Sequence, residues 1–253
     1  MTTRKTELMA GYVLHTRPYR DTSLIVELLT EQLGRVAAVA RGARKSRQRQ
    51  SLQPFIPLLI SCLGKGELKT LAAVEPAGQF FAYTGRTLFS GLYVNELIMR
   101  LLPVADPYPR IFYLYAELLA ALQQIEASIF DPAVIEELLR KFEFSLLEEL
   151  GYAIVLDTEF ETGEPVREGR IYRYEAEQGF ARVVSDAQAS EGSNNTEAFF
   201  AGEELCCIAV SDYRRAATRR TAKRLIRLAL RPHLGNRALK SRELFTQLLK
   251  RKR

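Results

Sequence analysis

Long hydrophobic runs are missing from this sequence. No stretch approaches the roughly 18 uninterrupted apolar residues that a membrane-spanning helix needs, so we expect no membrane span. Residues 1–8 carry charge and no apolar region follows them, and we therefore expect no secretory signal. The apolar share of 47% and the charged share of 26% are those of a globular protein that can bury a core.

Cysteine and histidine are scarce. The three cysteines, Cys62, Cys206 and Cys207, are odd in number and two are adjacent, which argues against a disulfide framework and fits a reducing compartment. The two histidines, His15 and His233, have no cysteine or carboxylate at metal-ligand spacing. We therefore expect a cytoplasmic protein without a metal site.

Catalytic motifs are also missing. The sequence contains no Gly-x-Ser-x-Gly, no His-Glu-x-x-His and no phosphate-binding loop with its lysine. The pairs Glu136-Glu137 and Glu148-Glu149 fall in expected helices, where neighbouring side chains point about 100° apart and do not form a catalytic dyad. We predict that the protein is not an enzyme and uses no cofactor.

Charge is present but segregated, although the net charge is only +6. Residues 1–86 hold 13 Lys and Arg against 6 Asp and Glu, residues 87–205 hold 8 against 22, and residues 206–253 hold 15 against 2. Two basic ends around an acidic middle favour a polyanion partner, and we favour nucleic acid. Basic tails without a specific partner are the simpler alternative.

Five short segments in the first part of the chain are typical of β-strands, namely 12–16, 24–29, 35–40, 58–63 and 67–74. Turn residues separate them, among them Gly34, Gly42 and Gly64-Lys65-Gly66. Five such strands predict a small closed antiparallel barrel, which is the description of an OB-fold, a barrel that often binds oligonucleotides. An SH3-like barrel fits the same pattern.

From about residue 84 the hydrophobic period becomes helical. We expect helices ending at Pro103, over 111–127, and from Pro132 to Gly151, the last capped by Asp131. The predicted class is thus α+β, with an OB-fold barrel at 1–82 and a mainly helical domain at 83–253.

The rest of the second domain is less regular. An irregular insertion is expected at 157–205, with a hairpin of 171–174 and 180–184 across Gly179 and a mobile polar loop at 185–197. A basic helix is expected from about 213 to 230, stopped by Pro232, and a last helix capped by Ser241.

A first basic cluster follows the third expected strand and consists of Arg41, Arg44, Lys45, Arg47 and Arg49. Without a neighbouring acid, it predicts a flexible arm at the barrel rim that neutralises phosphates without reading sequence. Tyr12, Tyr19 and Phe55 are candidates for stacking on bases. A solvated loop, with the aromatic residues in the core, is the alternative.

A second basic cluster lies in the expected C-terminal helix and consists of Arg214, Arg215, Arg219, Arg220, Lys223, Arg224, Arg227 and Arg231. Arg220, Arg224, Arg227 and Arg231 share one face of that helix, and leucines supply an apolar side. Such a helix fits phosphate, an acidic protein tail, or the chain's own acidic middle segment.

Seven segments in register resemble the RecO family of bacterial recombination mediators: 12–23, 34–44, 52–58, 64–70, 90–97, 142–152 and 239–245. The resemblance spans nearly the whole chain. It implies an N-terminal OB-fold, a helical C-terminal domain, and binding to single- and double-stranded DNA at the nucleoid. It further implies annealing of complementary strands, partnership with RecR and with the tail of single-stranded-DNA-binding protein, and loading of RecA at gaps.

The resemblance turns the clusters into candidate sites. For DNA we predict the arm together with Arg35 of the third strand. For the acidic, apolar-ended partner tail we predict Leu139, Arg140, Lys141 and Phe142. Arg220, Arg224, Arg227, Arg231, Lys240 and Arg242 form a secondary basic face for either partner.

Two further expectations concern metal and the choice of polymer. Some members of the family carry a four-cysteine zinc site in the second domain. Here Asp157 follows the Leu150-Gly151-Tyr152 motif, and Cys206-Cys207 alone do not complete a tetrahedral set, so we expect no zinc. An RNA-binding barrel protein of RNA processing or translation remains the alternative, because phosphate is common to both polymers.

Overall fold

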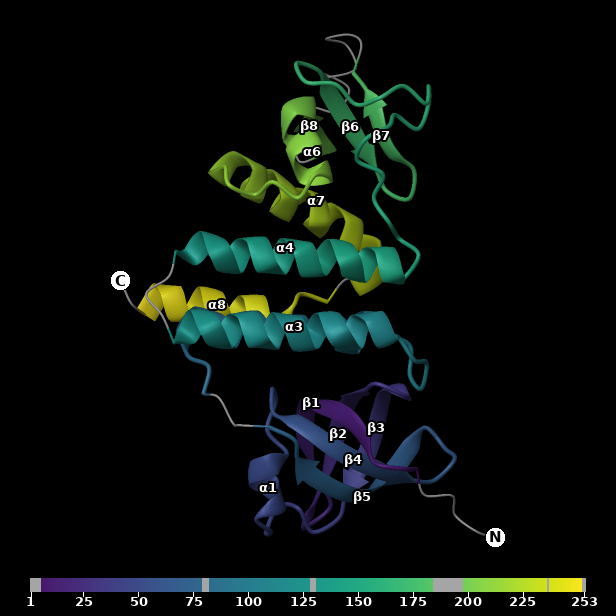
Figure 1. The fold of residues 1–253 in the computed structure, drawn as a ribbon, viewed down its shortest axis with the longest axis vertical. Coiled ribbons are helices and arrows are strands. Elements are labelled where there is room, and N and C mark those ends of the chain that lie inside the picture. Colours follow the sequence, from purple (N-terminus) through teal and green to yellow (C-terminus); the bar gives the residue numbers. More distant parts are fainter. Residues whose placement is uncertain (1–5, 79–81, 128–130, 184–197, 236, 252–253) are drawn as a thin grey trace. The chain divides into compact units, whose positions relative to one another are not determined.

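The computed structural model describes residues 6–78, 82–127, 131–183, 198–235 and 237–251, shown in Figure 1. It divides into two compact units, one made of Met1–Ile129 with Ala238–Arg253 and the other of Phe130–Arg237. The helices that follow the barrel are thus shared between the two units. The expected mobile loop at 185–197 lies outside the described residues.

The first unit begins with a closed barrel of five strands, β1 (Met9–Tyr19), β2 (Ser23–Thr30), β3 (Gly34–Ala40), β4 (Pro57–Leu63) and β5 (Leu68–Pro76). The strand order is β1-β2-β3-β5-β4, and β4 returns to pair with β1. All pairings are antiparallel except that of β3 with β5, which closes the barrel. The predicted OB-type barrel and the α+β class are confirmed.

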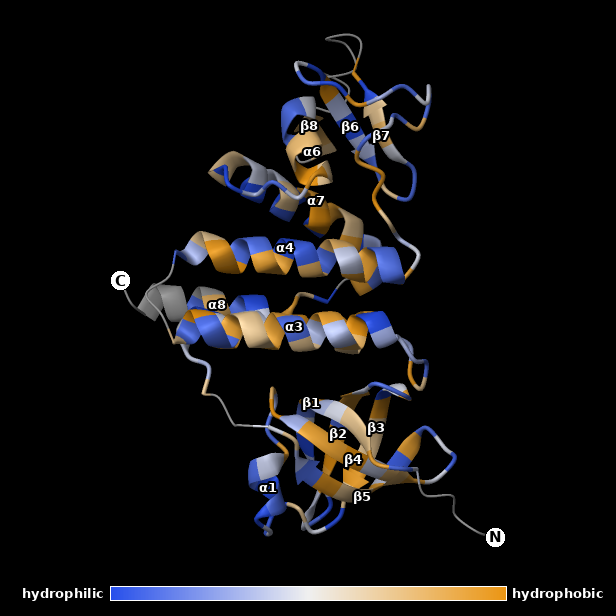
Figure 2. Ribbon diagram, in the orientation of Figure 1, coloured by the Kyte–Doolittle hydropathy of each residue, from blue (hydrophilic) through white to orange (hydrophobic). Residues whose placement is uncertain are grey.

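Buried and partly exposed residues alternate along the strands, and the buried ones fill the barrel. In β3, Val36, Ala38 and Ala40 point inward and are at most 1% exposed, while the residues between them are partly exposed. Such alternation is the two-residue period of a strand with one buried face. The short helix α1 (Gln48–Ser51) lies between β3 and β4 and is hydrophilic beside the mostly hydrophobic strands (Figure 2).

Three helices complete the first unit: α2 (Gly85–Leu101), α3 (Pro109–Glu126) and α8 (Lys240–Arg251). Asn95 of α2 is buried and links the barrel to both α2 and α3. Its Nδ2 donates to the carbonyl of Leu14 at 2.9 Å, and its Oδ1 accepts from the Tyr115 hydroxyl at 2.7 Å. Because a buried amide without partners is costly, this pair of bonds explains a polar residue in an apolar interface.

Glu96 of α2 caps the first turn of α8. Its carboxylate accepts from the backbone N–H groups of Lys240 (3.0 Å) and Ser241 (2.9 Å), and from the Ser241 hydroxyl (2.7 Å). The prediction that Ser241 caps this helix is wrong, since Ser241 lies inside its first turn. The cap comes from a residue 145 positions away in sequence, which no local pattern could indicate.

We expect Glu96→Gln to destabilise the first unit by about 1 kcal/mol at neutral pH, because it weakens a charged cap. Burial raises the pKa of Glu96, but the hydrogen bonds from Ser241 and Lys240 and the charge of Arg100 outweigh it, and the net pKa is lowered. A lowered pKa gives stability that is present above the unfolded-state value of about 4.3 and is lost as pH falls through the folded value. The free energies of unfolding in urea should therefore differ between the parent and the variant at pH 7 and become equal in acid. A difference that persists in acid would contradict the role of Glu96 as a charged cap.

The second unit packs helices against a small sheet. It contains α4 (Pro132–Glu149), β6 (Ile171–Glu175), β7 (Gly179–Arg182), β8 (Phe199–Ala201), α6 (Gly202–Ala209) and α7 (Ala216–Leu234). The sheet order is β7-β6-β8, and β6 pairs antiparallel with β7, so the predicted hairpin is confirmed. The Asp131 cap is also confirmed, because its side chain accepts from the Ala133 N–H at 2.9 Å.

Two features of the second unit differ from expectation. Residues 202–209, which include Cys206 and Cys207, form the unpredicted helix α6. The basic helix α7 does not stop at Pro232 but continues to Leu234, with Gly235 after it at φ 64°. A proline removes one backbone donor and crowds the preceding turn. The helix tolerates this loss because only two residues follow the proline.

Candidate nucleic-acid interface

The basic arm is a connection between β3 and β4 that is anchored at both ends. Ala43 and Leu52 are 0% and 2% exposed and belong to the barrel core. Between these anchors the chain forms turns and the single helical turn α1, where we expected an irregular arm. The anchors hold the intervening cations at the barrel rim.

All five cations of the arm are exposed: Arg41, Arg44, Lys45, Arg47 and Arg49. Arg44 also fixes the arm to the β1–β2 turn. Its Nη1 donates to the carbonyls of Arg20 (3.2 Å) and Asp21 (3.1 Å), and its backbone N–H donates to Thr22 (2.9 Å). The arm and this turn therefore form one rim.

The rim brings in Tyr19 at the end of β1 and Arg20 in the β1–β2 turn. Arg20 is exposed and its guanidinium lies 5.1 Å from the centre of the Tyr19 ring. We did not list Arg20 among the candidates, although an antiparallel β1-β2-β3 meander brings the β1–β2 turn to the end of β3. Leu24 pairs with Ala40, which shows that these ends meet. Tyr19, the last residue of β1, is half-buried and lies beside the turn that Arg44 holds.

The other two aromatic candidates pack inside the first unit. Tyr12 contacts Phe112 and Tyr115, with ring centroids 5.6 and 5.2 Å away. Burial raises the pKa of its hydroxyl. Phe55 contacts Tyr83 at 5.2 Å. For these two residues the core alternative is the one that the structure supports.

Arg35 differs from the arm residues because its side chain already has partners within the first unit. Its Nε donates to the Leu102 carbonyl at 3.1 Å and its Nη1 lies 3.7 Å from the Glu27 carboxylate. Its own carbonyl accepts from the Ala105 N–H at 2.7 Å. These contacts tie β3 to the segment after α2, so a phosphate would compete with existing partners of the Arg35 guanidinium.

The predicted tail-binding residues on α4 do not share one exposed face. Phe142 is buried and Leu139 half-buried, while Lys141 is exposed and pairs with Glu137 at 2.7 Å. Arg140 is only 6% exposed, and two of its nitrogens lie 2.7 Å from the two carboxylate oxygens of Glu143, which is 0% exposed. Lys141 is therefore the solvent-facing charge of this segment.

The secondary basic face is divided between the two units. Arg220, Arg224, Arg227 and Arg231 lie on α7 of the second unit, whereas Lys240 and Arg242 lie on α8 of the first. Arg224 turns toward the small sheet, where its Nη2 donates to the Phe199 carbonyl at 2.6 Å and its guanidinium covers the Phe200 ring at 4.3 Å. Arg220, Arg227 and Arg231 are exposed.

The acidic middle segment neutralises the beginning of α7. Arg215 pairs with Glu203 (2.6 Å) and Glu204 (3.6 Å), and the Arg219 Nε lies 3.4 Å from Glu136. Of the three partners considered for this basic helix, the chain's own carboxylates thus account for its first turn, while Arg220, Arg227 and Arg231 further along are exposed.

The part of the chain that the structure describes offers neither a metal-binding cluster nor a membrane-spanning helix. No group of three His, Cys, Asp or Glu side chains there could hold a metal ion. Among the helices of this part of the chain, none has the length and hydropathy needed to cross a membrane.

Two family models cover the chain. The family described as "Recombination protein O N terminal" matches residues 4–80, and "Recombination protein O C terminal" matches residues 82–243. A protein of Cellvibrio japonicus named "DNA repair protein RecO" is 43% identical over 244 residues, which is 96% of this chain and 98% of the relative. Proteins of the same name are 43% identical in Haemophilus influenzae (96% of this chain, 97% of the relative) and 45% identical in Pseudomonas aeruginosa (93% of each). These names describe DNA repair.

Proposed function

We propose, for a chain that belongs to the RecO family of DNA repair and recombination proteins, that it binds single- and double-stranded DNA and anneals complementary strands. With RecR, it would help RecA replace single-stranded-DNA-binding protein at gaps, in the cytoplasm at the nucleoid. The observation that carries this proposal is the row of five exposed cations in the β3–β4 connection, four of which lie between the buried anchors Ala43 and Leu52.

The chemistry of the arm suits annealing. Lysine and arginine that contact phosphates release counterions and bind strands of any sequence. Tyr19 and Arg20 beside the arm supply an aromatic face and a further cation, the combination that single-strand barrels use for stacking and backbone contact. A protein that holds strands without reading them leaves the base edges free to pair.

For the protein partner, we propose that the acidic tail of single-stranded-DNA-binding protein meets α4 at Leu139, Arg140, Lys141 and Phe142. Lys141 offers the exposed charge, and the half-buried Leu139 offers apolar surface. We propose the exposed arginines of α7, Arg220, Arg227 and Arg231, as a second surface for DNA or the tail, because their side chains reach solvent on a helix that is basic on this side.

The experiment that tests the function is annealing of two complementary DNA oligonucleotides coated with single-stranded-DNA-binding protein. We expect this chain to accelerate annealing, and we expect the acceleration to drop at least tenfold when the coat protein lacks its acidic tail. Acceleration that ignores the tail would remove the partner proposal and keep the DNA proposal. A folded protein that gives no acceleration with either coat protein would remove both.

The same assay tests the RNA alternative. We expect complementary RNA strands to anneal no faster than DNA strands of the same sequence, since phosphate contacts do not distinguish the sugars. A clear preference for RNA would indicate recognition of the 2′-hydroxyl and would favour a role in RNA processing or translation.

A further inference from the structure

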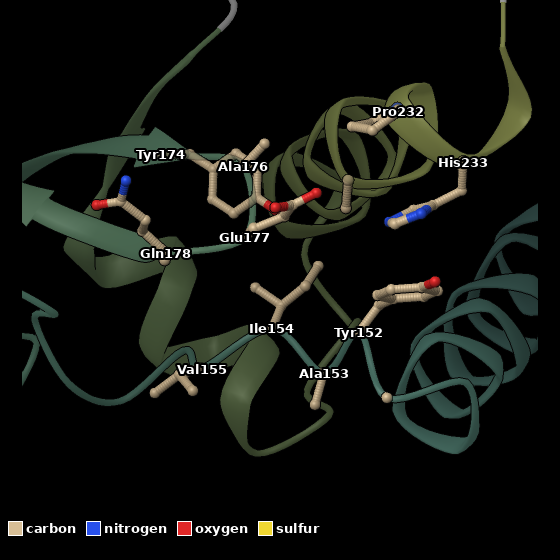
Figure 3. Close-up of a pocket in the computed structure, with 13 residues that line it drawn as sticks. Tyr152, Ala153, Ile154, Val155, Tyr174, Ala176, Glu177, Gln178, Pro232 and His233 are labelled. Carbon is tan, nitrogen blue, oxygen red and sulfur yellow. The ribbon is translucent and has the colours of Figure 1, made fainter.

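A small cavity lies in the second unit, at the ends of two helices. Its main lining residues come from the segment after α4, the β6–β7 turn and the last turn of α7: Tyr152, Ile154, Glu177, Gln178, Pro232 and His233. Figure 3 shows the Glu177 carboxylate on one side of this space and the paired rings of Tyr152 and His233 on the other. The two rings are stacked, with centroids 3.8 Å apart.

The size of the cavity limits its ligand. Its volume is about 170 Å³, whereas sites for small molecules usually begin at roughly 300 Å³. A nucleotide or an organic cofactor is therefore too large. A single amino-acid side chain that enters from a partner is of the right order.

The charge of the cavity favours a cation. The C-terminal ends of α4 and α7 lead into it, and each helix end carries about half a negative charge. Pro232 has no N–H, so the carbonyl four residues earlier lacks its usual helical donor. Glu177 adds a full negative charge, and among the described residues no basic side chain pairs with it. The last turn of α7 also carries two basic residues, His233 and the exposed Arg231.

The walls of the cavity fit a planar cation on an apolar stem. Tyr152 is 47% exposed, and because His233 covers one face of its ring, the opposite face is the one on which a guanidinium can stack. Ile154, Ala229 and Pro232 supply apolar contact for methylene groups. A carboxylate such as that of Glu177 accepts two parallel hydrogen bonds from one guanidinium.

We infer that this cavity binds an arginine side chain of a partner polypeptide, which stacks on Tyr152 and pairs with Glu177. The contact is separate from the DNA surface of the barrel. Charge complementarity selects a basic segment of the partner, in contrast to the acidic tail proposed for α4. The planar guanidinium, rather than charge alone, selects arginine over lysine.

The test is an NMR titration of the full chain with an acetylated and amidated Gly-Gly-Arg-Gly-Gly peptide. The matched probe carries citrulline in place of arginine, which keeps the planar shape and removes the charge. We expect shifts at residues 151–155, 176–179 and 229–233 with the arginine peptide, and binding at least about tenfold weaker with the citrulline peptide. Glu177→Gln should weaken binding of the arginine peptide to a similar degree. Glu161→Gln, a control at another exposed position, should leave this binding unchanged.

Three results would overturn the inference. They are equal binding of the citrulline peptide, unchanged binding by a folded Glu177→Gln variant, and shifts that map to another part of the chain. A free deoxynucleoside that perturbs these residues when the arginine peptide does not would identify a base site instead. Because the titration contains no DNA, its outcome is independent of the annealing experiment.

Discussion

Removing four charges from the arm should abolish most of the affinity for single-stranded DNA. The variant Arg41→Gln, Lys45→Gln, Arg47→Gln and Arg49→Gln keeps Arg44, whose guanidinium holds the β1–β2 turn. Each phosphate contact contributes about 0.7 to the slope of log affinity against log salt on a single strand, so the slope should fall by about 3. At low salt, this corresponds to an affinity loss on the order of 10²- to 10³-fold. Fluorescence anisotropy of a labelled oligonucleotide at several salt concentrations measures both quantities.

Net charge alone could mimic this effect, and a matched variant separates the two. The variant Arg86→Gln, Arg167→Gln, Arg170→Gln and Arg173→Gln removes the same charge from exposed positions that do not belong to the arm. We expect the slope of log affinity against log salt for this variant to stay within about 0.7 of the parent's slope, which corresponds to one phosphate contact. If both variants lose slope equally, binding follows the total charge and the arm has no special role. All eight positions are exposed, so thermal unfolding should change little.

Arg35 extends this comparison to the one predicted DNA residue that lies apart. Arg35→Gln should lower stability through the lost contacts to Leu102 and Glu27, with little change in the salt slope. If the salt slope instead falls as much as it does for one arm residue, Arg35 contacts DNA. The slope therefore assigns Arg35 to one role or the other.

The barrel could be predicted from sequence because its features are local. Two-residue alternation in β3 and glycine at the turns depend on residues close together in the chain, and the five strands appeared within a few residues of their expected positions. The basic arm could be predicted for the same reason, since five cations without an acid lie in one connection. Its attachment to the β1–β2 turn could not, because that contact depends on backbone carbonyls that carry no sequence signature.

The positions that sequence reasoning missed depend on distant partners. Glu96 caps α8 from a position 145 residues away in the sequence. Arg140 looks like a surface cation in the sequence, whereas in the structure it is buried and paired with Glu143. Neighbouring residues in a helix point about 100° apart, so Arg140 and Lys141 need not share an environment. Sequence indicated a basic segment on α4 but not which of its two charges meets solvent.

Arg140→Ala should destabilise the second unit by about 3–5 kcal/mol, because it leaves the Glu143 carboxylate buried without its partner. Replacing both residues, as in Arg140→Met with Glu143→Leu, removes the buried charge along with the pair and should restore stability to within about 1–2 kcal/mol of the parent. Urea unfolding of the two variants measures the difference. Equal destabilisation by the single and double variants would show that the pair does not act as a unit.

The same variants test the proposal that α4 binds the acidic tail of single-stranded-DNA-binding protein. A weakened tail contact in Arg140→Ala is ambiguous, because a partly unfolded second unit would also bind poorly. Lys141→Glu leaves the buried Arg140–Glu143 pair intact and reverses the exposed charge. If this segment binds the tail, the variant should bind a tail peptide roughly tenfold more weakly, or weaker still. Glu148→Lys, on the exposed surface of the same helix, serves as the control for long-range charge. Normal tail binding by Lys141→Glu, together with normal binding by the stable double variant, would exclude both basic residues of this segment and move the tail site to the arginines of α7.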